Sequence, residues 1–184
     1  MHPMQQDLDE ILLTEDQIRQ RLDALALEIQ RDYADKDLTL VAILTGSVMF
    51  IADLLRRLPM QLRLDYVGIS SYRGQTRSAG VLVVTKALKL DVRDRDVLVV
   101  DDILDSGATL VKVREMILRL QPRSLKFCTF LEKSVPHYEI FQVDYVAFRI
   151  PNKFVVGYGL DYRERYRNLP CVGTLKPALV SSTG

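Results

Sequence analysis

Residues 97–110, with the sequence VLVVDDILDSGATL, decide the fold of this chain. The apolar run from Val97 to Val100 is typical of a buried β-strand, and it ends in the acidic pair Asp101 and Asp102. The chain then passes through a polar turn containing Gly107 into a helical pattern of apolar residues. This order predicts a strand, a loop and a helix in direct succession, which is the repeating unit of α/β folds.

The loop after this strand also has an unusual charge pattern. It places three carboxylates within five residues: Asp101, Asp102 and Asp105. Like charges so close together repel one another, so their arrangement at the end of a strand indicates a ligand rich in hydroxyl groups, or a cation. Gly107 lets the backbone approach a ligand closely, while the hydroxyls of Ser106 and Thr109 and the first N–H groups of the helix suit a phosphate. The alternative is a solvated polar turn in which Ser106 or Thr109 caps the helix.

A P-loop of the nucleotide triphosphatases is excluded here. The G-x-x-x-x-G-K-[ST] spacing is absent, and Ala108 stands where a lysine would be needed.

The bulk composition fits one globular enzyme domain. The chain has 184 residues, 48% of them hydrophobic and 27% charged, with a net charge of +1. Because that charge gives no whole-molecule attraction for nucleic acid, any anion recognition must be local. The sequence shows no candidate membrane span and no signal peptide, so we expect a cytoplasmic protein. Cys128 and Cys171 lie in apolar runs without metal-ligand spacing, which favours reduced core residues.

Further along the chain, helical and strand patterns alternate. Thr14 and Gln17 form a plausible capping box for a helix whose apolar stripe runs from Ile18 to Ile29. A second helix is expected over residues 48–58 and a third over the residues after the acidic loop as far as about 120. Strands are expected at 38–44, 62–69, 81–88, 97–100, 125–131, 143–149 and 154–158. We therefore predict a single domain, 1–184, of α/β class with a mostly parallel twisted sheet flanked by helices and ligands at the carboxyl ends of the strands.

The acidic segment resembles the signature of phosphoribosyltransferases that use phosphoribosyl pyrophosphate (PRPP). Three more segments resemble the hypoxanthine-guanine branch of that family, in the family's order. LTGSVMFIADLL (44–55) is similar to its pyrophosphate loop, SSYRGQ (70–75) to the start of its mobile flap, and KFVVGYGLDYRERYRNLP (153–170) to its purine-binding end. The resemblance implies a type I phosphoribosyltransferase-like fold with a small base-binding hood.

The resemblance also implies a role for individual residues. Those expected to bind PRPP are Asp101, Asp102, Asp105, Ser106, Gly107, Ala108, Thr109, Thr45, Gly46 and Arg167. Among them, Asp101 and Asp102 would hold the ribose hydroxyls, and residues 105–109 would surround the 5′-phosphate. The backbone at Thr45 and Gly46, together with Arg167, would meet the pyrophosphate, and the Leu44–Thr45 peptide is expected to be cis. The flap would use Ser71 and Tyr72.

The base would be held at a neighbouring site. Residues implied for purine binding are Lys133 at the 6-oxygen, Phe154 stacked on the ring, Val155 at the ring edge, and Asp161. Asp105 would be catalytic, as the base at purine N7. Magnesium is the implied cofactor, with Asp101, Asp102 and Asp161 near the metal. The implied partners are PRPP, hypoxanthine, guanine and pyrophosphate, with no nucleic acid or membrane, and the chain is expected to form a homodimer or homotetramer.

Taken singly, several of these residues have plainer interpretations. Lys133 alone would be interpreted as a solvated lysine at a strand end. Phe154 would be interpreted as a core aromatic residue, and Tyr72 as a surface tyrosine. Two positions also depart from the family pattern: Asp101, where many relatives have glutamate, and Thr45, where some have lysine. The predicted activity is purine salvage, in which hypoxanthine or guanine reacts with PRPP to give the nucleotide and pyrophosphate. Transfer to xanthine, adenine or uracil, and an RNA-binding regulator built on the same fold, are the alternatives.

Overall fold

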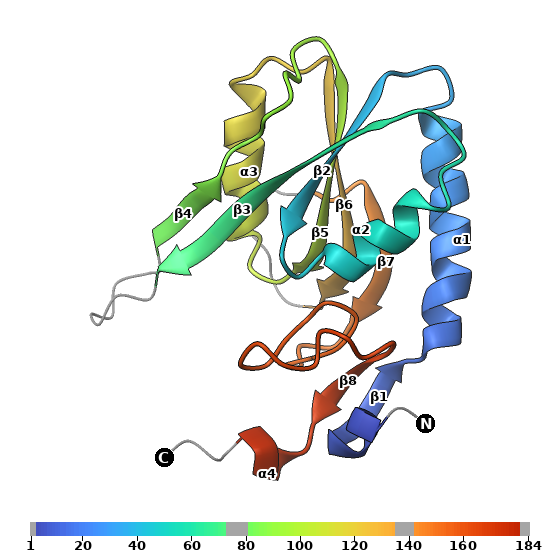
Figure 1. The fold of residues 1–184 in the computed structure, drawn as a ribbon, viewed down its shortest axis with the longest axis vertical. Helices are drawn as coiled ribbons and strands as arrows, with labels where there is room; N and C mark the ends of the chain where they lie inside the picture. The colour runs from blue at the N-terminus through green and yellow to red at the C-terminus, as the bar shows by residue number, and fades with distance from the viewer. Residues whose placement is uncertain (1–2, 73–80, 135–141, 181–184) are drawn as a thin grey trace.

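A computed structural model describes residues 3–72, 81–134 and 142–180 (Figure 1). The chain begins with a short 3-10 helix, Pro3–Asp7, followed by β1 (Leu8–Leu13) and α1 (Glu15–Asp32). The central elements are β2 (Leu38–Leu44), α2 (Val48–Leu55), β3 (Arg63–Tyr72), β4 (Val81–Lys86), β5 (Asp96–Leu104), α3 (Ala108–Leu118), β6 (Ser124–Lys133) and β7 (Tyr145–Ile150). The last elements are β8 (Val172–Leu175) and α4 (Pro177–Val180).

Six strands form the central sheet in the order β4-β3-β2-β5-β6-β7. All neighbouring pairs are parallel except β3 with β4, which is antiparallel. The chain leaves β2 toward β3 on one side and later returns to β5 on the other side of β2. Parallel α/β sheets bind ligands where the strand order reverses in this way, at the carboxyl ends of the strands. The predicted fold class, a mostly parallel sheet with flanking helices, is confirmed.

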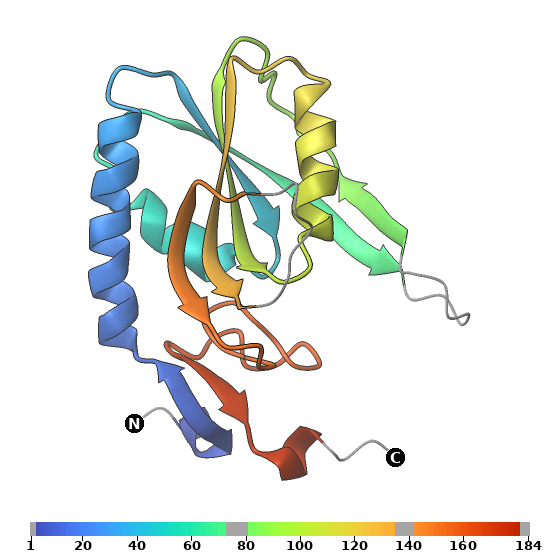
Figure 2. The same ribbon diagram turned by 180° about the vertical axis from the view of Figure 1, so that it is seen from behind.

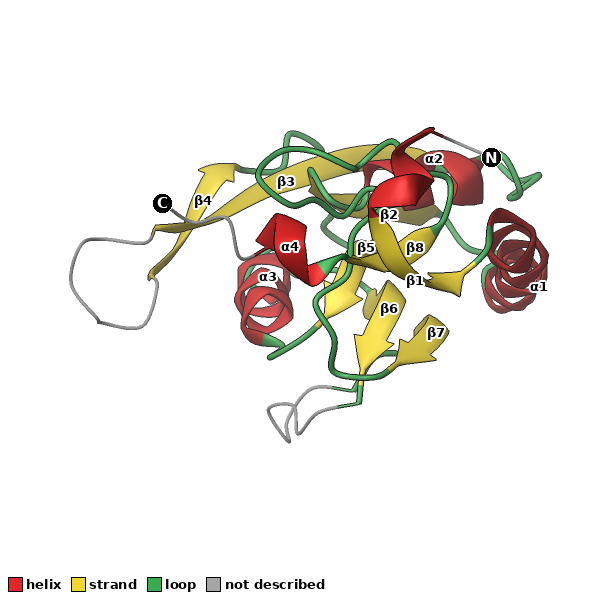
Figure 3. Cartoon of the chain, turned by 90° about the horizontal axis from the view of Figure 1, so that it is seen from below, coloured by secondary structure: helices red, strands yellow, loops and turns green. Residues whose placement is uncertain are grey.

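Helices cover both faces of this sheet, as the view in Figure 3 shows, with α3 on one side and α1 and α2 on the other. The first core cluster joins α1 and α2 to alternate residues of the strands, such as Leu40, Leu98 and Phe130. The second joins α3 to the intervening residues, such as Val41, Val97 and Val99. Strands that alternate in this way between two apolar layers are buried on both faces, and this explains their near-continuous hydrophobic runs.

The predicted start of α1 is confirmed in detail. Thr14 is the N-cap residue, its hydroxyl accepts from the Gln17 backbone N–H, and the Gln17 side chain accepts from the Thr14 backbone N–H. The buried stripe of α1 comprises Ile18, Leu22, Leu25, Ala26 and Ile29. In contrast, α2 ends at Leu55 rather than near Leu58, because Leu58 precedes Pro59 and a residue before proline is disfavoured in the helical conformation.

A small hood lies below the carboxyl ends of the central strands in Figures 1 and 2 and is built from both ends of the chain. Its loops run through residues 151–170, and β1 pairs with β8 as a separate two-stranded antiparallel sheet. The strand expected at 154–158 is wrong, because this segment makes only two isolated bridges, from Val156 to Gly173 and from Gly157 to Leu160. Sequence reasoning also missed β1 and β8. Within the described ranges, no helix is long and apolar enough to cross a membrane.

Candidate active site

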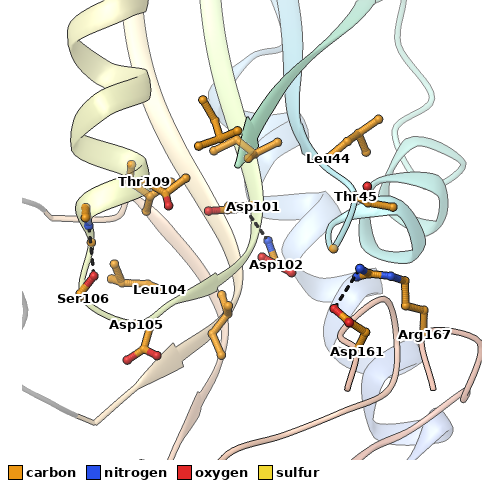
Figure 4. A pocket seen from close by; sticks show the side chains of 17 residues that line it. Leu44, Thr45, Asp101, Asp102, Leu104, Asp105, Ser106, Thr109, Asp161 and Arg167 are labelled. Atoms are coloured by element: carbon orange, nitrogen blue, oxygen red, sulfur yellow. Dashed lines mark hydrogen bonds and ion pairs between the residues drawn. The ribbon is translucent and has the colours of Figure 1, made fainter. Parts of the chain in front are cut away.

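The carboxyl ends of two strands and one hood loop surround a cavity of about 340 Å³. β2 delivers Thr45 and Gly46, β5 delivers the acidic segment, and the hood contributes Asp161 and Arg167, as Figure 4 shows. The polar and glycine positions that line the cavity are Thr45, Gly46, Asp101, Asp102, Asp105, Ser106, Gly107, Thr109, Asp161 and Arg167. Residues separated by more than a hundred positions in the sequence, such as Thr45 and Arg167, therefore meet in one pocket because the hood loop lies against the carboxyl ends of the central strands.

The acidic pair lies at the back of this cavity. Asp101 is only 4% exposed, and its carboxylate accepts a hydrogen bond of 3.0 Å from the backbone N–H of Asp102. Burial, and next the charge of Asp102, raise the pKa of Asp101 well above its usual range. Burial also raises the pKa of Asp102, although hydrogen bonds and the nearby Arg167 charge oppose that shift. Hydroxyl donors from a ligand would stabilise the charged form of both groups.

The loop after β5 offers backbone donors but no cationic side chain. Gly107 has a φ of +85°, a left-handed conformation that a side chain would disfavour, and it occupies the N-cap position of α3. It provides no capping side chain, and the Ala108 N–H makes only a long contact of 3.4 Å to the Ser106 hydroxyl. The first N–H groups of α3 thus point toward the cavity end of the helix, where the helix dipole favours an anion.

The loop after β2 lies close against the acidic pair. The Leu44–Thr45 peptide is cis, as the resemblance implied. Ser47 follows this loop, is fully buried, and donates its hydroxyl to the Ile43 carbonyl at 2.5 Å. A Cβ placed on Gly46 would come within 1.6 Å of an Asp102 carboxylate oxygen. Only glycine therefore lets this backbone pass the acidic strand end at such short range.

The hood side of the cavity carries one basic group and its partners. The Arg167 guanidinium forms an ion pair of 2.9 Å with Asp161 and donates to the Gly159 carbonyl at 2.8 Å. A second ion pair, of 3.3 Å, joins Arg167 to Glu164. These bonds fix the guanidinium at the cavity wall, where it faces Asp102. Arg167 is therefore a fixed group of the cavity wall and not a free surface arginine.

Beyond Asp105 lies the region expected to bind the base. The Lys133 ammonium forms an ion pair of 2.8 Å with Asp105, and its side chain is only 12% exposed. This geometry contradicts the interpretation of Lys133 as an ordinary solvated lysine. Phe154 is 57% exposed and packs edge-on against Tyr162, with ring centroids 5.8 Å apart, whereas Val155 is buried. An aromatic face so exposed is available for stacking, and a core role for Phe154 is excluded.

All of the residues expected to bind PRPP, including Ala108, line this same cavity. Lys133 is joined to it through Asp105, while Phe154 and Val155 lie outside its lining. Ser71 and Tyr72 end β3, but their side chains and flap residues 73–80 lie outside the described residues. Sequence reasoning missed the apolar lining: Ile43, Leu44, Ile69, Ile103, Leu104 and Leu110. Four of these six residues lie at the carboxyl ends of β2 and β5, and that position in the sequence could have identified them as part of the site.

Oxygen ligands of the kind that magnesium prefers are present at this site, but they do not form a complete metal cage. Asp161 is engaged by Arg167, and Asp102 lies against Gly46. Among residues 3–72, 81–134 and 142–180, no group of three or more acidic, cysteine or histidine side chains is placed to hold a metal ion. Magnesium commonly keeps several waters and binds through one or two carboxylates together with substrate phosphates, and this donor set fits that mode.

Comparison with known proteins identifies the family. Residues 10–163 match the model of the phosphoribosyl transferase domain. The chain belongs to the phosphoribosyltransferase family. Among curated phosphoribosyltransferases it is 42% identical to the hypoxanthine-guanine phosphoribosyltransferase of Staphylococcus aureus strain Mu50, across 97% of this chain and 100% of that protein. The protein of the same name from Staphylococcus epidermidis is also 42% identical, over 97% of this chain and 99% of that protein.

Solved structures of phosphoribosyltransferases agree with this assignment. A crystal structure of a hypoxanthine phosphoribosyltransferase from Staphylococcus aureus superimposes with a TM-score of 0.91 and 43% identity, covering 97% of each chain. The hypoxanthine phosphoribosyltransferase of Trypanosoma cruzi in complex with the product IMP has a TM-score of 0.86 and 36% identity, over 94% of this chain and 97% of that one. The expected family, fold and class of enzyme are thus confirmed, and phosphoribosyl transfer is the reaction of this family.

Proposed function

We propose that this phosphoribosyltransferase transfers the 5-phosphoribosyl group of PRPP to hypoxanthine or guanine, giving IMP or GMP and pyrophosphate in purine salvage. The observation that carries the proposal is the ion pair between Lys133 and Asp105 at the edge of the acidic cavity. It supports the proposal because the ammonium could donate to a 6-oxygen and the adjacent carboxylate could accept the N7 proton. The names and near-complete coverage of the Staphylococcus relatives support the same substrates.

PRPP would occupy the cavity with its ribose toward the acidic pair. The carboxylates of Asp101 and Asp102 would accept hydrogen bonds from the 2′- and 3′-hydroxyls. Backbone N–H groups of residues 105–109, with the Ser106 and Thr109 hydroxyls, would hold the 5′-phosphate. The backbone at Thr45 and Gly46 and the Arg167 guanidinium would face the pyrophosphate, which gains negative charge as the bond to the anomeric carbon breaks.

The purine would lie between the strand end and the hood. Its 6-oxygen would accept from the Lys133 ammonium, Phe154 would stack on its face, and the Val155 backbone would contact its edge. N9 attacks the anomeric carbon, and the ring must then lose a proton. Asp105 would accept or direct that proton at N7 as a general base.

Magnesium is the proposed cofactor. It would supply positive charge that stabilises the charge developing on the leaving group. Asp101 and Asp102 would hold it together with the ribose hydroxyls, and Asp161 would orient its water shell. The protein's own part is to position the substrate and supply these oxygen atoms.

Several broader expectations remain proposals. We propose a single domain over residues 1–184, a homodimer or homotetramer, and a flap that begins at Ser71 and Tyr72 and covers the pyrophosphate during catalysis. A covering segment is needed because water would otherwise trap the positively charged ribose. The cytoplasmic location stays a prediction.

Nucleotide formation from PRPP and magnesium across five bases tests the proposal. We expect product with hypoxanthine and guanine and roughly 10⁴-fold lower kcat/KM with adenine, because adenine lacks the 6-oxygen acceptor and would turn its own amino donors toward the Lys133 ammonium. Xanthine and uracil complete the panel. Failure to form any nucleotide, combined with a specific shift of RNA in a gel, would replace the enzyme by an RNA-binding regulator of the same fold.

A further inference from the structure

One hood turn lies directly against the loop that follows β2. Gly159 has a φ of +103°, and a Cβ placed on it would come within 2.0 Å of the Gly46 carbonyl oxygen. On its other side, Gly46 lies against Asp102, where a Cβ would come within 1.6 Å of a carboxylate oxygen. The backbone at Gly46 is therefore enclosed between the hood and the acidic strand end. Any movement of the hood turn changes the room available to this loop.

The residue next to Gly159 attaches that turn to α2. Tyr158 is 6% exposed, and its hydroxyl donates a hydrogen bond of 2.7 Å to the carboxylate of Asp53. Asp53 belongs to α2, which begins immediately after the loop, and the Val48 N–H donates to the Thr45 carbonyl at 3.2 Å. The Tyr158–Asp53 bond therefore ties the hood to the helix that carries the loop.

Two further features show that this bond is well defined. Tyr158 has a φ of +50°, a left-handed conformation that is uncommon for an aromatic residue and needs support from its surroundings. Burial, and next the hydrogen bond to Asp53, raise the pKa of Tyr158. The phenol thus remains protonated, and a donor, at neutral pH.

We propose that Tyr158 and Asp53 are a positioning pair that holds the Gly46 backbone at the distance from Asp102 that pyrophosphate binding requires. The inference rests on the proposed function, in which this backbone meets the pyrophosphate of PRPP. Neither side chain lines the PRPP cavity, so the pair acts through the loop and not by contact with substrate. Its removal should weaken binding of PRPP and pyrophosphate and spare the purine, whose proposed contacts come from β6 and residues 154–155.

The test compares Tyr158→Phe with a matched control. Tyr166 lies in the same hood segment, also has a positive φ, and also donates its hydroxyl to an aspartate, Asp7, at 3.1 Å. That bond joins the hood to the N-terminal segment instead of α2, so Tyr166→Phe removes an equivalent hydrogen bond away from the loop. Steady-state kinetics would give KM for PRPP, KM for hypoxanthine and the inhibition constant of pyrophosphate.

We expect Tyr158→Phe to raise KM for PRPP and the inhibition constant of pyrophosphate roughly 3- to 10-fold, the range for one lost hydrogen bond. KM for hypoxanthine should stay within about 2-fold, and Tyr166→Phe should leave all three constants near wild type. Asp53 provides a second pair of variants. Asp53→Asn retains an acceptor for the phenol and should behave like wild type, whereas Asp53→Ala should reproduce Tyr158→Phe.

The outcomes separate this inference from the proposed function. A wild-type protein that forms no nucleotide from PRPP and purine overturns the proposed function, and the inference with it. Active wild-type enzyme with unchanged PRPP and pyrophosphate constants in Tyr158→Phe overturns the inference alone, as does an equal rise of the hypoxanthine KM. If Tyr158→Phe does not fold, Asp53→Asn and Asp53→Ala decide, and equal constants in these two variants count against the positioning pair.

Discussion

Two buried aspartates on the same sheet have opposite surroundings. Asp65 in β3 is 6% exposed and accepts backbone hydrogen bonds from Tyr66, Lys89 and Leu90, and an ion pair of 3.3 Å from Lys86. Burial alone would raise its pKa, but these donors outweigh burial and lower the pKa of Asp65. Asp101 in β5 is 4% exposed, yet burial and the neighbouring Asp102 raise its pKa well above the usual range.

The difference separates a structural carboxylate from one that requires a ligand. A buried charge is tolerated when donors from the protein surround it and is costly when they do not. At Asp65 the protein supplies those donors and thereby fixes the segment after β4. At Asp101 the protein supplies the Asp102 N–H, and further donors would come from a bound molecule, for which the hydroxyls of a ribose are of the right kind. Substitutions at the two places should therefore affect stability in one case and binding in the other.

The largest effect is expected at Asp105, on the ligand side of this comparison. Its side chain is 57% exposed, so Asp105→Asn should leave the folded state and PRPP binding intact. If the carboxylate handles the N7 proton, kcat should fall roughly 10²- to 10⁴-fold, the usual range for loss of a general base. Steady-state turnover with hypoxanthine measures this, and an unchanged kcat would remove Asp105 from the proton transfer.

Substitution of Lys133 sharpens the comparison, because it should change the preference among purine bases without changing PRPP binding. Lys133→Met should raise KM for hypoxanthine and guanine and narrow the preference for hypoxanthine over adenine roughly 10- to 100-fold, since a charged hydrogen bond to the 6-oxygen is lost. KM for PRPP should stay near wild type. Ratios of kcat/KM for the two bases decide the matter, and a mutant that keeps the full preference would leave specificity to the backbone near Val155.

Asp65→Asn tests whether Asp65 serves the stability of the fold and not ligand binding. The amide NH₂ would face N–H donors that now meet a carboxylate oxygen, so we expect a loss of roughly 2 to 3 kcal/mol in the free energy of unfolding. For a chain of this size that corresponds to a fall in Tm of roughly 5 to 10 °C. Below the transition, kcat and both KM values should match wild type. A substantial loss of activity in the folded variant would break the distinction between the two aspartates.

The smallest expected effect is on the free energy of unfolding at low pH. Because the folded-state pKa of Asp65 is lowered, its contribution to stability is complete above the unfolded value of about 4 and is lost as the pH falls through the folded value. Urea unfolding at several pH values should therefore show the gap between wild type and Asp65→Asn constant near neutrality and shrinking below about pH 4. A gap that does not depend on pH would show that the lost stability is unrelated to the carboxylate charge.

Local sequence patterns were sufficient to predict the strands of the central sheet and the helices that flank it. The run at 97–100 and the capping box at Thr14 each follow from neighbouring residues, and both are present in the structure. The hood was not predictable in this way. β1 and β8 pair across more than 150 residues, and Val155 and Val156 are apolar because they are buried in the hood, not because they form a strand. A short apolar run does not reveal whether its residues are buried in a strand or in a loop.

For the candidate site, sequence reasoning found the residues but not their contacts. The motifs identified the acidic pair, the loop at Gly46 and Arg167, all of which line the same cavity. They did not reveal that Lys133 pairs with Asp105 or that Tyr158 reaches Asp53, because both contacts depend on side chains from separate elements. Such contacts follow from tertiary packing, which local sequence patterns do not specify.

Asp101 is the buried carboxylate for which the structure most clearly requires a ligand. The decisive measurement is an isothermal titration of PRPP with magnesium into wild type and into Asp101→Asn, with Tm recorded for both proteins. We predict that the variant binds PRPP at least 10-fold more weakly, since hydrogen bonds to a charged group are lost, while its Tm equals or exceeds that of wild type because a costly buried charge is gone. Unchanged PRPP affinity, or a variant that is clearly less stable, would contradict the account.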